Sequence, residues 1–206
     1  YLGDLNGGPD STFNPIFIHS SNGGLTWGNP MEVDLSTVTF EAGGNTLVQE
    51  LQALWEDSPG VPTSSGRATC SFEYDMTVDA NGNPHLFVVV ASASDNVNTP
   101  SYTVFGGLAK LAVDIFSEDG GVTWKAVKVA PIYAFRGEFG TPDPTNGSLL
   151  DMDNFPQISR TQDGSKIFYS WADSDTTVTG YSNRVNQAPN LRIAGRRLSD
   201  GFMTCP

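Results

Sequence analysis

Two short clusters of acidic side chains carry oxygen atoms in the alternating pattern that suits Ca²⁺. Asp151 and Asp153 precede Asn154 in one cluster. Asp173 and Asp175 follow an apolar run in the other. Carboxylate and amide oxygens on a loop are typical calcium ligands, but neither cluster has the glycine and terminal glutamate of an EF-hand loop. A solvated turn after a strand is the simpler interpretation, and calcium is the one cofactor that we consider; otherwise we expect none.

The side chains that usually carry acid–base or nucleophilic catalysis lack their partners in this sequence. His19 and His85 are its two histidines, and no HExxH or paired-histidine spacing is present to bind a catalytic metal. No G-x-S-x-G motif marks a serine nucleophile. We therefore assign no catalytic residue from these side chains.

The long polar connections between apolar runs hold side chains that can contact a ligand. These connections span about 36–71, 92–107, 131–154 and 172–189. Loops on a regular scaffold often carry function. Their aromatic rings can stack on sugars or contact proteins, or can fill the space beneath their own loops, and both interpretations stay open. The candidate ligand-binding side chains are Trp55, Tyr102, Tyr133, Phe135, Arg136 and Tyr181.

An eight-residue pattern, S-x-[DN]-G-G-x-T-W, occurs twice, each time between two strand-like apolar runs. Its Asp or Asn can accept hydrogen bonds from its own turn, its glycines permit positive φ, and its Trp offers a flat face for packing. Both copies are therefore predicted to be β-hairpin turns with a structural role. Their defining side chains are Ser20, Asn22, Gly24, Thr26 and Trp27 in the first copy, and Ser117, Asp119, Gly121, Thr123 and Trp124 in the second.

A second kind of hairpin alternates with the first. Apolar runs flank Asn81-Gly82 within about 72–92 and Asp163-Gly164 within about 155–172, and such dipeptides are strong hairpin signals. A final strand-like segment, 190–204, runs into Asp200-Gly201, which we interpret as a degenerate third box without its Trp. Helical periodicity occurs only over 47–55.

One turn hairpin followed by one box hairpin makes a four-stranded antiparallel unit, which has the size of a propeller blade. The sequence therefore predicts an all-β fold, a β-propeller of four-stranded antiparallel blades, with about two and a half blades in residues 1–206. The predicted parts are the second half of one blade over 13–35, a full blade over 72–130 and most of a third over 152–206.

Composition narrows the classes of partner. The chain has 206 residues and a formal net charge of -12, which disfavours phosphate backbones and anionic lipid, so we expect no nucleic-acid partner and no membrane insertion. Cys70 and Cys205 can form a disulfide or remain two separate thiols. The chain begins at Tyr1 without a targeting segment, so we expect a mature product or an excerpt.

At the two repeated boxes the sequence resembles the Asp-box, or BNR-repeat, family of sialidase-like β-propellers. The resemblance implies a secreted or cell-surface protein, with each box between the third and fourth strands of a blade on the rim away from the active face. The mixture of hairpins also resembles large secreted proteins of Bacteroidota-type bacteria. Because two to three blades cannot close a ring, we expect the rest of a larger chain or an assembly partner. A smaller β-sandwich that uses the same box is the alternative fold.

The enzymes of that family resemble one another in three arginines that bind a carboxylate, a Tyr–Glu nucleophile pair and an Asp acid/base. Here Phe135-Arg136-Gly137 lacks the expected Ile-Pro, so no catalytic residue is transferred. We expect a propeller that binds a glycan or a protein. The alternatives are a sialidase-like glycoside hydrolase whose catalytic residues lie partly outside this chain, and a purely structural module of a larger surface assembly.

Overall fold

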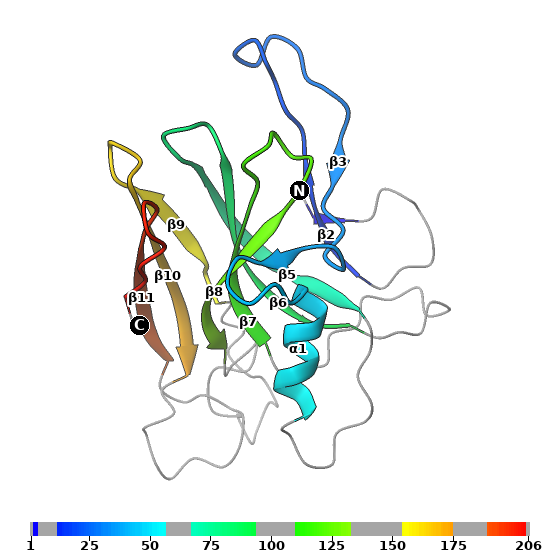
Figure 1. Ribbon diagram of the computed structural model, residues 1–206, viewed down its shortest axis with the longest axis vertical. Coiled ribbons are helices and arrows are strands. Elements are labelled where there is room, and N and C mark those ends of the chain that lie inside the picture. The colour runs from blue at the N-terminus through cyan, green and yellow to red at the C-terminus, as the bar shows by residue number, and fades with distance from the viewer. Residues whose placement is uncertain are drawn as a thin grey trace, which may run out of the picture.

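The computed structural model describes residues 2–3, 12–56, 67–93, 110–132, 154–174 and 189–204. It consists mostly of antiparallel β-sheet with one short helix, so the all-β prediction is confirmed. Figure 1 shows the described elements. Their bounds are β1 Leu2–Gly3, β2 Asn14–Phe17, β3 Met31–Glu32, β4 Thr39–Phe40, α1 Leu47–Glu56, β5 Ala68–Val78, β6 Pro84–Ser92, β7 Lys110–Phe116, β8 Lys125–Ile132, β9 Gln157–Arg160, β10 Lys166–Ser174 and β11 Pro189–Arg197.

The central sheet is an antiparallel meander of β5, β6, β7 and β8. It contains the predicted turn hairpin, β5–β6, and the predicted second box hairpin, β7–β8. A fifth strand, β4, adds to the edge of β8 in parallel. We did not predict β4, which is only two residues long.

Two smaller sheets flank the central one. The first contains β1, β2 and β3, and the β2–β3 connection carries the first box. The other, called the third sheet, contains β9, β10 and β11. After β11 and a turn, Met203 forms an antiparallel bridge with Arg196. That turn, around Asp200-Gly201, closes with a hydrogen bond from Arg197 N to Phe202 O of 2.9 Å. Both flanking sheets therefore extend the antiparallel hairpin order that the sequence predicts.

The central sheet is buried on both faces, and β6 shows this most clearly. Leu86, Val88 and Val90 lie in a core cluster with the first sheet and α1. Phe87 and Val89 lie in a second cluster with the third sheet. A strand that is covered on both sides needs a continuous apolar run instead of an alternating one, which is what the sequence of β6 has. The three sheets therefore pack in chain order as an open stack, and the described residues do not close a ring.

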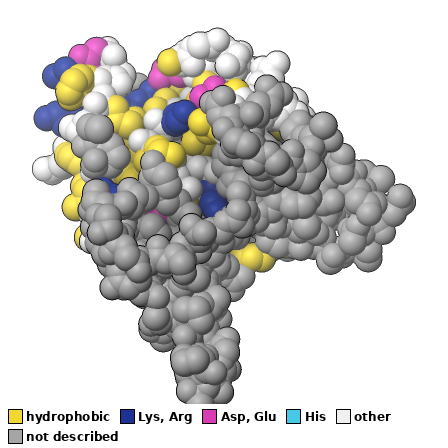
Figure 2. Space-filling model, turned by 90° about the horizontal axis from the view of Figure 1, so that it is seen from below, with side chains coloured by type: hydrophobic (Ala, Val, Ile, Leu, Met, Phe, Trp, Pro, Cys, Tyr) yellow, Lys and Arg dark blue, Asp and Glu magenta, His cyan; other side chains and the backbone are white. Residues whose placement is uncertain are grey.

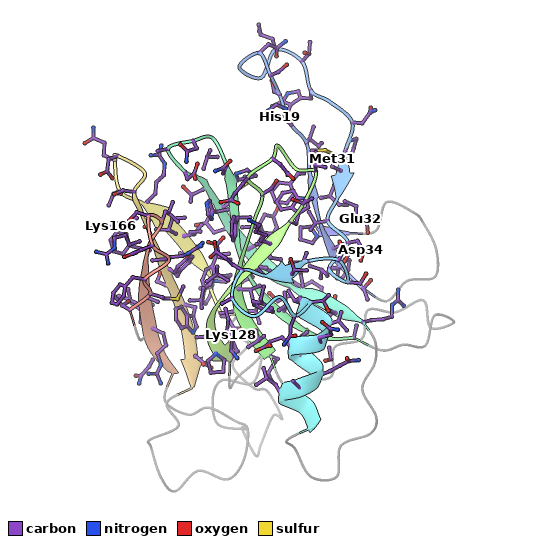
Figure 3. The ribbon with its side chains drawn as sticks, in the orientation of Figure 1. His19, Met31, Glu32, Asp34, Lys128 and Lys166 are labelled. Carbon is purple, nitrogen blue, oxygen red and sulfur yellow. The ribbon has the colours of Figure 1, made fainter. Side chains whose placement is uncertain are left out.

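Helix α1 covers one end of the first core cluster with Leu47, Val48 and Leu51. Its start is a capping box, since Gln49 N donates to Thr46 Oγ1 at 3.2 Å and Thr46 N donates to Gln49 Oε1 at 2.8 Å. Lys128 reaches from β8 to the helix, with its Nζ 3.2 Å from Glu50 Oε1 (Figure 3). Within the described ranges, no helix is long and apolar enough to span a membrane.

Candidate functional site

The two ends of the stacked sheets carry different kinds of connection: short hairpin turns at one end and the ends of β6, β8 and β10 at the other. The β2–β3, β5–β6, β7–β8 and β9–β10 turns all lie at one end, at the top of Figure 1, and α1 lies toward the other. The long connections leave the strands at that other end, because β6, β8 and β10 all finish there. Seen from below, the described surface shows hydrophobic side chains interspersed with charged ones of both signs (Figure 2).

The second box is a loop closed by its own side chains. Asp119 Oδ1 accepts hydrogen bonds from Val122 N at 3.0 Å and Thr123 N at 2.9 Å, and Ser117 Oγ donates to the same oxygen at 2.9 Å. Bonds from the Thr123 hydroxyl and backbone are the main reason that the pKa of Asp119 falls to about 2. Gly121 has a φ of 94°, which an L side chain rarely adopts.

The first box repeats this geometry with Asn in place of Asp. Asn22 Oδ1 accepts from Thr26 N at 2.9 Å, and Asn22 Nδ2 donates to the Thr26 hydroxyl at 2.8 Å. Ser20 Oγ accepts from Gly24 N at 2.8 Å, as Ser117 does from its glycine. An amide can therefore replace the carboxylate in this loop. His19 precedes the loop and is exposed (Figure 3).

The two box tryptophans have different surroundings. Trp124 stacks on Phe17 of the preceding sheet, with ring centroids 4.7 Å apart and an interplanar angle of 25°. Trp27 is 64% exposed. The second box therefore links two sheets through its Trp.

A buried polar cluster lies between the central and third sheets, near the box end. Asp114 Oδ2 is 2.9 Å from His85 Nδ1, accepts from Tyr169 Oη at 2.7 Å, and lies 3.6 Å from Arg196 Nη1. Arg196 Nη2 also contacts Glu41 at 2.5 Å. Burial and then the nearby Asp114 carboxylate raise the pKa of Tyr169. Because the His85, Asp114, Tyr169 and Arg196 side chains are all buried, this cluster joins the sheets and offers no access to a ligand.

An aromatic hollow of about 190 Å³ lies where β5 approaches the segment that leads into β9. Phe72, Tyr74 and Phe155 are 43%, 38% and 52% exposed, which is unusual for three neighbouring rings. The residues that line this aromatic hollow are Phe72, Glu73, Tyr74, Phe155, Pro156 and Gln157.

Local irregularities of the backbone position these rings. The register of β5 against β6 shifts between Cys70 and Tyr74, so a bulge carries Phe72 and Glu73. Phe72 also makes an edge contact with Phe13, at 5.7 Å between ring centroids. On the other side of the hollow, Phe155 has a positive φ of 47°. The hollow is therefore built from a bulge in β5 and a strained residue in the segment that leads into β9.

The sequence-predicted ligand and metal residues are mostly not placed by the structure. Tyr102, Tyr133, Phe135, Arg136 and Tyr181 lie outside the described residues, as do Asp151, Asp153 and Asp175, and the side chain of Trp55 is not described. Asp173 is buried at 2% exposure on β10. Among the described residues no group of three or more side chains could hold a metal ion. Calcium remains a prediction.

The cysteine prediction also remains open. The Cys70 thiol is fully buried and burial raises its pKa, whereas Cys205 lies outside the described residues. Sequence reasoning missed the aromatic hollow, although the exposed apolar alternation of Phe72 and Tyr74 in a polar stretch was a usable signal.

Comparison with known proteins leaves the family open, because no protein-family model and no curated protein matches the chain. The geometry alone describes what the site can do. Three exposed rings beside a carboxylate and an amide can stack on a flat or partly apolar ligand and hydrogen-bond its polar groups.

Proposed function

We propose that this chain is a secreted or cell-surface binding module that takes a glycan in the aromatic hollow. The observation that carries the proposal is the exposure of Phe72, Tyr74 and Phe155 around one hollow. Sugar rings present apolar C–H faces and polar edges, and aromatic rings with nearby carboxylate and amide groups complement both.

The charge of the hollow favours a neutral glycan. Its described lining includes the acidic Glu73 and neither Lys nor Arg, and the whole chain carries a net charge of -12. An acidic sugar would meet like charge on approach. Neutral oligosaccharides are therefore the expected ligands, ahead of sialylated ones.

We also propose that the stacked sheets are consecutive blades of an Asp-box β-propeller. Support comes from the two interfaces, in which each antiparallel sheet packs on the one before it in chain order. The outer face of the third sheet exposes Phe168, Leu191, Ile193 and Phe202, as a sheet does when a further sheet is expected to cover it. The propeller proposal thus predicts the rest of a larger chain, or an assembly partner, on this face.

The glycan proposal is tested by binding of the full chain to immobilised mannobiose, N-acetyllactosamine and sialyllactose. At least one neutral sugar should bind, and Phe72→Ala with Tyr74→Ala should weaken that binding by about tenfold or more. Phe168→Ala is the matched control, because Phe168 is also 43% exposed but lies outside the hollow. Equal losses in the control, or binding to none of the sugars, would contradict the proposal.

The same assay separates binding from hydrolysis. No arginine of this chain matches a catalytic motif of the sialidase-like enzymes, and Arg196 and Arg197 form ion pairs with Glu41 and Asp200. We therefore expect the bound oligosaccharide to be recovered intact. Release of free monosaccharide would replace the binding proposal by the glycoside hydrolase alternative.

A further inference from the structure

We propose that Glu73 is a positioning residue, which holds Phe155 in a strained backbone conformation and so sets the affinity of the aromatic hollow for its sugar. This inference rests on the proposed function. It concerns one hydrogen bond between two sheets, from Phe155 N to Glu73 Oε2 at 2.9 Å.

The backbone of Phe155 is unusual for its residue type. It is the one non-glycine residue with positive φ in the described part of the chain. A bulky side chain in this left-handed region is strained, and such residues persist only where their surroundings over-determine them. Core packing does not explain the strain here, because the Phe155 ring is 52% exposed. The ring is instead presented to the hollow.

The neighbours of Phe155 are held firmly on the third sheet. Asn154 is buried, and its Nδ2 donates to Ala172 O at 3.0 Å while Ala172 N donates to Asn154 O at 2.6 Å. Pro156 is also buried and has a fixed φ. With both flanks fixed, the Phe155 amide points to the Glu73 carboxylate, and this bond links the strained residue to the β5 bulge.

A second carboxylate on β5 makes the same kind of bond without touching the hollow. Asp75 Oδ2 accepts from Ile158 N at 3.0 Å, and Ile158 packs in the second core cluster. Glu73 and Asp75 thus join β5 to the segment 155–158 side by side. Only the Glu73 bond ends on a residue of the hollow, so Asp75 serves as an internal control for sheet-to-sheet attachment.

Three variants of the full chain test the assignment against the neutral sugar that binds best. Glu73→Ala should weaken binding by about tenfold, because the ring is no longer held in place for the ligand. Glu73→Gln keeps an acceptor oxygen for the Phe155 amide, so hydrogen exchange of that amide should stay at the rate of the unaltered chain. Asp75→Ala should lower the melting temperature as Glu73→Ala does and leave affinity unchanged. Hydrogen exchange of the Phe155 amide should accelerate in Glu73→Ala alone.

The outcomes separate the two proposals. Loss of binding by Phe72→Ala and Tyr74→Ala but not by Glu73→Ala would overturn the positioning role and leave the glycan proposal standing. Equal weakening in Glu73→Ala and Asp75→Ala would show a general effect of sheet attachment and would also overturn it. If no sugar binds, the glycan proposal fails, and an unchanged Phe155 amide exchange rate in Glu73→Ala would independently overturn the positioning role.

Discussion

Both faces of the central sheet are covered by a neighbouring sheet, but the side chains at the two interfaces differ in chemistry. The face toward the first sheet is covered by aliphatic side chains and by the Trp124–Phe17 stack. The face toward the third sheet combines an apolar cluster with the buried Asp114, His85 and Arg196. Apolar burial depends mainly on area, whereas a buried hydrogen-bonded ion cluster requires one particular alignment of its members. The interface between the central and third sheets therefore restricts the relative position of its two sheets more than the interface with the first sheet does.

The largest effect is expected from Asp114→Ala, which breaks the polar interface. It removes the carboxylate that contacts His85, Tyr169 and the buried Arg196, so the free energy of unfolding should fall by about 3–5 kcal/mol. Chemical denaturation measures this change in the free energy of unfolding. Ile115→Val is the control on the same strand, where it faces the apolar cluster, and should cost about 0.5–1.5 kcal/mol. Equal losses in the two variants would remove the distinction between the faces.

An intermediate effect on stability is expected at the interface between the first and central sheets, where Trp124 of the second box stacks on Phe17. Trp124→Ala deletes the stack on Phe17 and should reduce the free energy of unfolding by about 1–2 kcal/mol. Trp27→Ala removes the corresponding side chain of the first box, which is 64% exposed, and should change it by less than about 0.5 kcal/mol. Thermal melts of the two variants give the comparison. A larger loss for Trp27 than for Trp124 would mean that an interface beyond the described residues uses the first box.

The smallest expected effect is a change in how the stability of the protein depends on pH. The pKa of Asp119 is lowered to about 2, chiefly by its bonds to Thr123, so its ionised form stabilises the folded state at pH values above the ordinary Asp pKa of about 4. That contribution is lost as pH falls from about 4 toward 2. Asp119→Asn imitates the first box and should lose this part of the pH dependence. Melting temperatures of both proteins between pH 5 and pH 2 should therefore converge, and a constant difference would contradict the assigned pKa.

The hairpins could be predicted because their signals are local. Asp119 bonds only to residues within its own loop, and Asn81-Gly82 and Asp163-Gly164 lie in turns closed by residues a few positions away. Short turns make β5 and β6, and likewise β7 and β8, antiparallel neighbours, which is why these two hairpins could be predicted. Helix α1 covers the one segment, 47–55, in which the sequence shows helical periodicity, although we predicted no helix there.

The candidate site could not be predicted in this way. Phe72 lies on β5 and Phe155 lies in the segment that leads into β9, and the hollow between them depends on a bulge in β5 and on the positive φ of Phe155. Asp114 stands in an apolar run with nothing nearby in sequence to pair with it, and its partners come from β6, β10 and β11.

Sequence alone therefore determined the all-β class, the hairpin order and the box loops, since each depends on interactions over a few residues. Only the tertiary structure decided which sheet faces meet, where charge is buried between them and where aromatic rings stay exposed. The physical reason is that alternate side chains of a strand point to opposite faces, so one bulge changes what each face presents, and the partner face comes from a distant part of the chain.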